Sequence, residues 1–135
     1  MAERDIVFDN LKTESNLFKL KEHLREIYDL IDNRFIEIDA AASVTFDADE
    51  AEVFYVELTT NITSITIKNP FKGREIQIVF KQDGTGSRTV AGFGSDVMLA
   101  GDSFSVTSNA NRHTTIAFVY ANDTWIEVSR TSDVY

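Results

Sequence analysis

The chain has 135 residues, enough for one domain with or without an appendage, and 43% of them are hydrophobic, as is typical of globular proteins. It contains no cysteine, which excludes disulfides and thiolate metal sites, and no apolar run long enough for a membrane span or a secretory signal. The net charge of −9, without a basic stripe, is unfavourable for nucleic-acid binding, so we expect neither nucleic acid nor membrane as a partner.

Charge and glycine divide the chain into two parts. Residues 1–52 carry 14 acidic and 6 basic side chains, whereas residues 53–135 carry 8 and 7, so the net charge is expected to be an N-terminal property. All 6 glycines lie between Gly73 and Gly101. This predicts a stalk and a head, with these boundaries: an N-terminal docking arm at 1–12, a helical stalk at 13–35, an acidic hinge with short strands at 36–52, and a β head at 53–135.

The first dozen residues combine apolar and acidic side chains. The apolar ones are Ile6, Val7, Phe8 and Leu11. Such a segment is typical of a peptide that becomes ordered on the surface of a partner, so we interpret it as the docking arm.

The next segment carries a helical pattern. Apolar residues alternate at spacings of three and four, the a/d pattern of a heptad, at Leu17, Leu20, Leu24, Ile27 and Ile31. One interpretation is an amphipathic helix lying on the β domain. The other, which we prefer, is a short parallel coiled coil in which these residues form a trimer seam. So short a coil is marginal in water and would need the β heads to hold it together.

From Ile36 onward the apolar residues recur with a period of two. Phe54, Val56 and Leu58 alternate with more polar neighbours, and later segments do the same between turn-forming residues. Because no helical pattern separates these segments, we expect them to pair mostly antiparallel. The predicted fold class is α+β and mainly β, with the N-terminal helix followed by a small antiparallel β-sandwich or open barrel of about seven or eight strands.

One turn in this region has a distinctive sequence. Asp83, Gly84 and Gly86 are predicted to form a tight hairpin turn, because Asp-Gly supplies positive φ and the second glycine permits a bulge.

The sequence contains few of the residue patterns that catalysis requires. The chain has 2 histidines, His23 and His113, and they are too isolated to suggest a zinc or iron site. An acidic run at 47–52 lacks the glycine and the spacing of an EF-hand loop, so a solvated acidic segment is the better interpretation. No nucleophile motif or phosphate-binding loop is present. We therefore expect no catalytic residues, no cofactor and no metal.

The β segment nevertheless has a recognisable pattern. It contains an asparagine turn at Asn61, an Asn69-Pro70 turn, the continuous run KQDGTGSRTV from Lys81 to Val90, and a last hairpin with Tyr120 and Trp125. Over residues 53–130 this resembles a β domain of tailed-bacteriophage tail fibres and other virion appendages. The family usually has a tryptophan or proline after the run, where this chain has AGFG at 91–94.

The resemblance implies a non-enzymatic structural module, usually a homotrimer, displayed on the virion surface and made in the cytoplasm of the host bacterium. We expect a short trimeric knob or fibre whose N-terminus is anchored to other virion proteins. Attachment to the capsid, as a decoration or head fibre, is preferred because the chain is short. The alternative is a short tail fibre or receptor-binding protein that recognises a host surface glycan, with Phe93, Asp96 and Asn109 as candidate receptor-facing residues.

Overall fold

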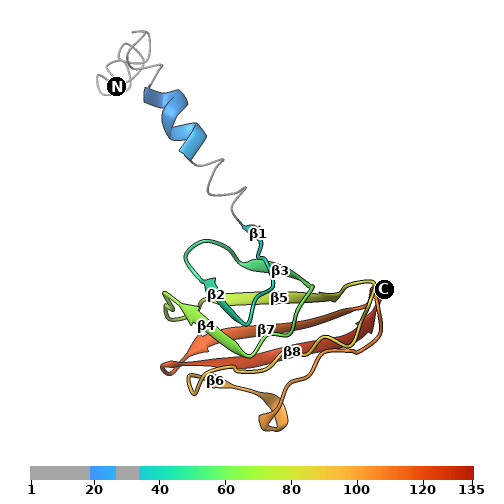
Figure 1. The fold of residues 1–135 in the computed structure, drawn as a ribbon. Coiled ribbons are helices and arrows are strands. Elements are labelled where there is room, and N and C mark those ends of the chain that lie inside the picture. Colours follow the sequence, from blue (N-terminus) through green and yellow to red (C-terminus); the bar gives the residue numbers. More distant parts are fainter. Residues whose placement is uncertain (1–18, 27–33) are drawn as a thin grey trace, which may run out of the picture. The chain divides into compact units, whose positions relative to one another are not determined.

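The computed structural model describes residues 19–26 and 34–135, and it divides the chain into two compact units, residues 1–33 and 34–135 (Figure 1). In the first unit, residues 19–26 form a helix, on which Leu20 and Leu24 are 41% and 46% exposed. The coiled coil and the docking arm stay predictions, because their other residues lie outside the described part of the chain. These are Leu17, Ile27 and Ile31 in the seam, and Ile6, Val7, Phe8 and Leu11 in the arm.

The second unit is built from strands, and the prediction of a mainly β fold is confirmed. Residues 34–135 contain eight strands and one 3₁₀ turn: β1 (Phe35–Glu37), β2 (Ser43–Asp47), β3 (Val53–Leu58), β4 (Ser64–Lys68), β5 (Glu75–Gln82), β6 (Val97–Met98), η1 (Ala100–Asp102), β7 (His113–Ala121) and β8 (Thr124–Val134). A large sheet has the order β1-β3-β5-β7-β8-β6, and a small sheet pairs β2 with β4 (Figure 1).

The prediction of mostly antiparallel pairing is wrong. The pairs β1–β3, β3–β5, β2–β4 and β6–β8 are parallel, and only β5–β7 and β7–β8 are antiparallel. From β1 to β5 the chain alternates between the two sheets, so each strand of one sheet connects two parallel neighbours in the other. That crossover supplies the long connection that a parallel pair requires. This part of the chain is therefore a short two-sheet stack rather than a set of hairpins.

The two strands of the small sheet have matching sequences. SVTFD in β2 lies in register with SITIK in β4, so that Ser43 pairs with Ser64 and Thr45 with Thr66. The serines and threonines are exposed, while the apolar residues between them are buried. A repeat of about 20 residues is within the range of solenoid proteins, in which successive turns bury one continuous core.

The core lies between the inner faces of the two sheets. Its largest members have at most 1% of their surface exposed: Phe46, Phe54, Leu58, Ile62, Ile78, Phe80, Ile116, Phe118 and Trp125. Residues 36–52, expected to form an acidic hinge, belong to this unit. The reason is that β2 contributes Phe46 to the core and the following turn contributes Ala48 and Ala51.

The turn after β5 is not a hairpin. Asp83 Oδ1 accepts hydrogen bonds from the backbone N–H groups of Thr85 and Gly86, at 3.1 and 3.0 Å. Positive φ falls on Gly86 rather than on Gly84. Beyond the turn, Val90 forms a parallel bridge with Ile62, so the chain has crossed to the small-sheet side. The residues of the predicted hairpin turn thus form a side-chain-capped turn between the two layers.

Candidate functional site

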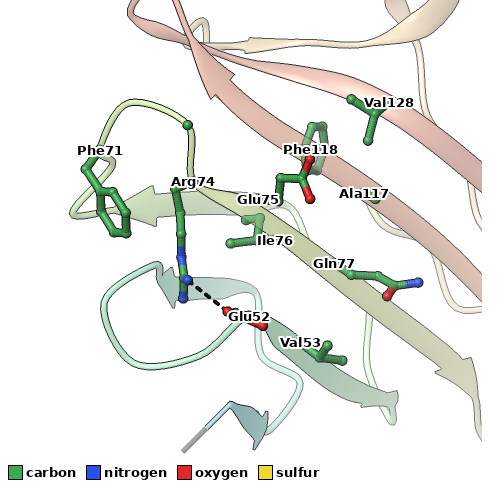
Figure 2. A pocket seen from close by; sticks show the side chains of 11 residues that line it. Glu52, Val53, Phe71, Arg74, Glu75, Ile76, Gln77, Ala117, Phe118 and Val128 are labelled. Carbon is green, nitrogen blue, oxygen red and sulfur yellow. Dashed lines mark hydrogen bonds and ion pairs between the residues drawn. The ribbon is translucent and has the colours of Figure 1, made fainter. Parts of the chain in front are cut away.

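A groove of about 440 Å³ opens along the outer side of the large sheet (Figure 2). Residues from β3, β5, β7 and β8 line it, together with the loop between β4 and β5 and the residue before β3: Glu52, Val53, Phe71, Gly73, Arg74, Glu75, Ile76, Gln77, Ala117, Phe118 and Val128. It combines one exposed aromatic ring, three acidic or amide side chains and an apolar base. The lining is therefore part polar and part apolar.

Arg74 fixes one end of the groove. Its guanidinium donates to the backbone carbonyls of Ala48 at 3.0 Å and Ala51 at 2.7 Å, and it pairs with Glu52 at 3.4 Å. The same guanidinium lies 5.4 Å from the centre of the Phe71 ring, a cation–π distance. Arg74 is only 17% exposed, so it acts as a rigid link between the β2–β3 turn and the loop that carries Phe71.

Glu52 is held in its ionised form. Arg34 donates two hydrogen bonds to its Oε2, at 2.8 and 3.2 Å, and Arg74 lies near its Oε1. The hydrogen bonds from Arg34 lower the pKa of Glu52, and the positive charges of Arg34 and Arg74 lower it further. The groove therefore keeps a carboxylate at this end across the neutral and mildly acidic pH range.

The middle of the groove is lined by the outer face of the large sheet. Val53, Gln77 and Ala117 lie in one row, because Val53 pairs with Gln77 in the parallel ladder and Gln77 with Ala117 in the antiparallel one. Val128 from β8 is 55% exposed and extends the apolar lining. Figure 2 shows Phe71 beside Arg74 at one end and Gln77 farther along β5.

The structure does not bring the three candidate receptor-facing residues together. Phe93 packs on the core: its ring centre lies 5.7 Å from that of Phe104 and 5.5 Å from that of Phe118, with edge-on geometry. Its side chain therefore has a packing role, in place of the expected outward position.

Asp96 and Asn109 are exposed but lie at opposite ends of β8. The Asp96 carbonyl accepts from Trp125 N–H at 2.7 Å, whereas the Asn109 side chain donates to Asp133 at 2.7 Å. Eight residues of strand separate Trp125 from Asp133, which corresponds to roughly 25 Å. Hydrogen bonds from Asn109 and Thr107 lower the pKa of Asp133, so Asn109 helps to fix the C-terminal end of β8. These residues cannot form one compact receptor site within a single chain.

Residues 19–26 and 34–135 contain no group of three or more histidine, aspartate or glutamate side chains placed to hold a metal ion. No helix among the same residues is both long and apolar enough to cross a membrane.

Sequence reasoning missed the groove and its key residues. Phe71 follows the Asn69-Pro70 turn, and an aromatic residue in a polar turn is a signal of an exposed ring. Arg74 and Gln77 carry no motif. Their role depends on the register between β3, β5 and β7, which a single sequence does not reveal.

Most of the chain is similar to a known protein family. A family model described as "Putative phage tail fibre C-terminal domain" matches residues 27–125, which is more than two thirds of the chain. The matched range includes β1 to β7 and every residue of the groove except Val128. No curated protein matches the chain.

Proposed function

The chain belongs to the phage tail fibre C-terminal domain family, and from this membership we propose that it is a non-enzymatic structural protein forming a short trimeric fibre on the virion surface. The family match is the observation that carries the proposal. In this proposal the β unit points outward and the N-terminal arm binds other virion proteins.

The architecture suits a fibre tip. In residues 35–93 each pass of the chain adds one strand to the large sheet and one strand or bridge to the small sheet. Parallel stacking of this kind places β3 between β1 and β5 and buries a continuous core, which makes a stiff module. A stiff module at the end of an appendage can present a surface without collapsing onto the particle.

Attachment to the tail is favoured over attachment to the capsid. Short length had suggested a capsid-decorating knob, whereas the matching family is described by its place in tail fibres. Immunogold labelling of intact virions with antibodies against the β unit tests this directly. Label at the tail is expected. Label on the capsid would contradict the tail assignment, and unlabelled virions would contradict the whole proposal.

The trimer is proposed to form through the heptad seam. Leu20 and Leu24 support this, because both are apolar and more than 40% exposed on the described helix. Light scattering of the full chain should give a mass near three times 15.2 kDa. Leu24→Asp should shift the mass toward that of the monomer, since it places three carboxylates in one desolvated seam.

A matched control is available one residue earlier on the same helix. His23 lies outside the a/d pattern, and its side chain is 74% exposed, so His23→Asp should leave the trimer intact. Equal effects of the two substitutions would show that the loss comes from added charge rather than from the seam. A wild-type monomer at micromolar concentration would refute the trimer.

A further inference from the structure

We propose that the groove on the large sheet receives the Phe35 ring of a second copy of this chain. The β units of neighbouring subunits then pack head to tail through the outer faces of their large sheets, with β1 of one copy on β7 and β8 of the next. This rests on the proposed function in one respect, because it starts from the trimer and assigns the surface through which its β units meet. In a head-to-tail contact the inserting and receiving surfaces differ, which allows three copies to close into a ring.

Phe35 supplies the side chain that inserts. It lies on β1, at one edge of the large sheet, and it is 50% exposed, although a phenylalanine is normally buried. Its ring centre lies 6.3 Å from that of Tyr55, so the ring packs against another aromatic ring before any contact between copies forms. A side chain that is already ordered loses little rotamer entropy when it binds.

The groove supplies the hollow that receives this ring. Its volume of about 440 Å³ is large enough for an aromatic side chain, and Ala117 and Val128 line it on β7 and β8. The side chain of Ala117 is a single methyl group, which leaves space beside Val128. Val128 is 55% exposed, so a ring placed there would remove apolar surface from water on both copies.

The face around the groove has the composition of an interface. Its central residues on β3, β5 and β7 are apolar and partly buried: Val53, Tyr55, Val79, Ala117 and Val119. The charged residues lie at its border: Glu37, Glu57, Lys72, Glu75 and Lys81. A sheet face that meets water normally carries polar residues, whereas the centre of an interface is depleted of charge. Two such faces can therefore meet without burying an unpaired charge at the centre.

The length of the connecting segment favours a second copy over a partner of another sequence. Residues 27–33 join the described helix, which ends at Glu26, to Arg34. Even a fully extended chain of this length spans at most about 30 Å. Three helices joined in the proposed seam would therefore keep three β units at a high effective concentration, at which weak contacts between copies become populated.

The test is disulfide crosslinking of the full chain, which contains no cysteine of its own. Phe35→Cys and Val128→Cys are introduced together, and the oxidised protein is separated by denaturing electrophoresis without reductant. β1 and β8 lie four strand spacings apart in the sheet, about 19 Å, so the two positions cannot be bridged within one chain. A covalent species of three chains is expected. Uncrosslinked chains alone would overturn the inference, and a species of two chains alone would overturn the ring in favour of a two-fold contact.

A matched pair controls for collisions between tethered units. Ser64 is exposed on the outer face of the small sheet, so Ser64→Cys with Val128→Cys should give at least fivefold less of the three-chain species. Equal yields from the two pairs would refute the specific contact.

A further substitution locates the receiving site. In the Phe35→Cys, Val128→Cys background, Ala117→Arg fills the groove and should lower the three-chain yield at least fivefold. Thr66→Arg, on the exposed face of the small sheet, should change it less than twofold. Both variants should keep the melting temperature of the background protein. A yield unchanged by Ala117→Arg would refute the groove as the receiving site.

The outcome separates this inference from the proposed function. A wild-type protein with the mass of a trimer, whose cysteine pair gives no three-chain species, would refute only the contact between β units. Three-chain crosslinks in a protein that is absent from virions would refute only the structural role.

Discussion

Gln82 offers the sharpest test of the fold. Its side chain is 1% exposed at the end of β5, and its Nε2 donates to the carbonyls of Arg88 and Thr107, both at 2.7 Å. Its Oε1 accepts from Arg88 N–H at 3.0 Å. One buried amide therefore ties the turn after β5 to the segment before β7. Gln82→Leu keeps a similar side-chain size but removes all three hydrogen bonds.

The expected cost follows from those three bonds. At about 1 kcal/mol for each hydrogen bond, Gln82→Leu should lower the free energy of unfolding by about 3 kcal/mol. For a unit of this size that corresponds to roughly 15 °C in Tm. Urea unfolding can be followed by the fluorescence of Trp125, which is the only tryptophan and is fully buried.

The control for this change lies on the same strand. Gln77 is exposed, so Gln77→Leu should alter the free energy of unfolding by less than about 0.5 kcal/mol. If Gln82→Leu costs no more than Gln77→Leu, the three hydrogen bonds do not stabilise the folded state and the reasoning fails.

Two further predictions concern backbone crowding and pH. Gly92 and Gly73 have φ of +92° and +87°, but a Cβ at Gly92 would overlap the Thr63 carbonyl, whereas a Cβ at Gly73 meets open space. In the same urea assay, Gly73→Ala should therefore lower the free energy of unfolding by about 1 kcal/mol and Gly92→Ala by more than about 4 kcal/mol. Equal decreases would refute the close approach of Gly92 to the Thr63 carbonyl. Hydrogen bonds from arginines lower the pKa values of Glu52 and Glu127 below their ordinary 4.5. The two ionised carboxylates therefore stabilise the folded state fully above pH 4.5, and this stabilisation is lost as the pH falls through the lowered pKa values. When Tm is measured from pH 5.5 down to pH 3, it should decrease once the pH is below 4.5, and the decrease should be less steep in Glu52→Gln. A Tm that rises on acidification would contradict the expected direction of the pH dependence.

The strands were predictable from local pattern, and their pairing was not. Alternation of Phe54, Val56 and Leu58 requires only that one face be buried, so it marks β3 whatever its neighbours are. Parallel or antiparallel pairing depends on where the chain goes between strands. The one available signal was the match between SVTFD and SITIK, which places identical residues on the outside of successive turns.

The site was harder to predict than the fold. Phe93 follows a glycine in an apparent loop, which suggested exposure, yet packing against Phe104 and Phe118 determines its position. Phe71 lies in a similar loop and is 47% exposed, with the Arg74 guanidinium 5.4 Å from its ring centre. Two phenylalanines in similar local sequences thus have opposite exposure, and only tertiary contacts distinguish them.

The structural units also change which part of the chain carries most of the net charge. Residues 1–33 carry 8 acidic and 5 basic side chains, and residues 34–135 carry 14 and 8, so most of the net charge of −9 belongs to the β unit. The difference from the N-terminal assignment comes from residues 34–52, whose 6 acidic side chains and 1 basic side chain lie in the β unit.

Much of that acidic charge has a structural partner. Lys68 lies 3.6 Å from Asp47, and Arg34 and Arg74 flank Glu52. The arginines that could have received an anionic ligand at the groove are therefore already paired with the protein's own carboxylates.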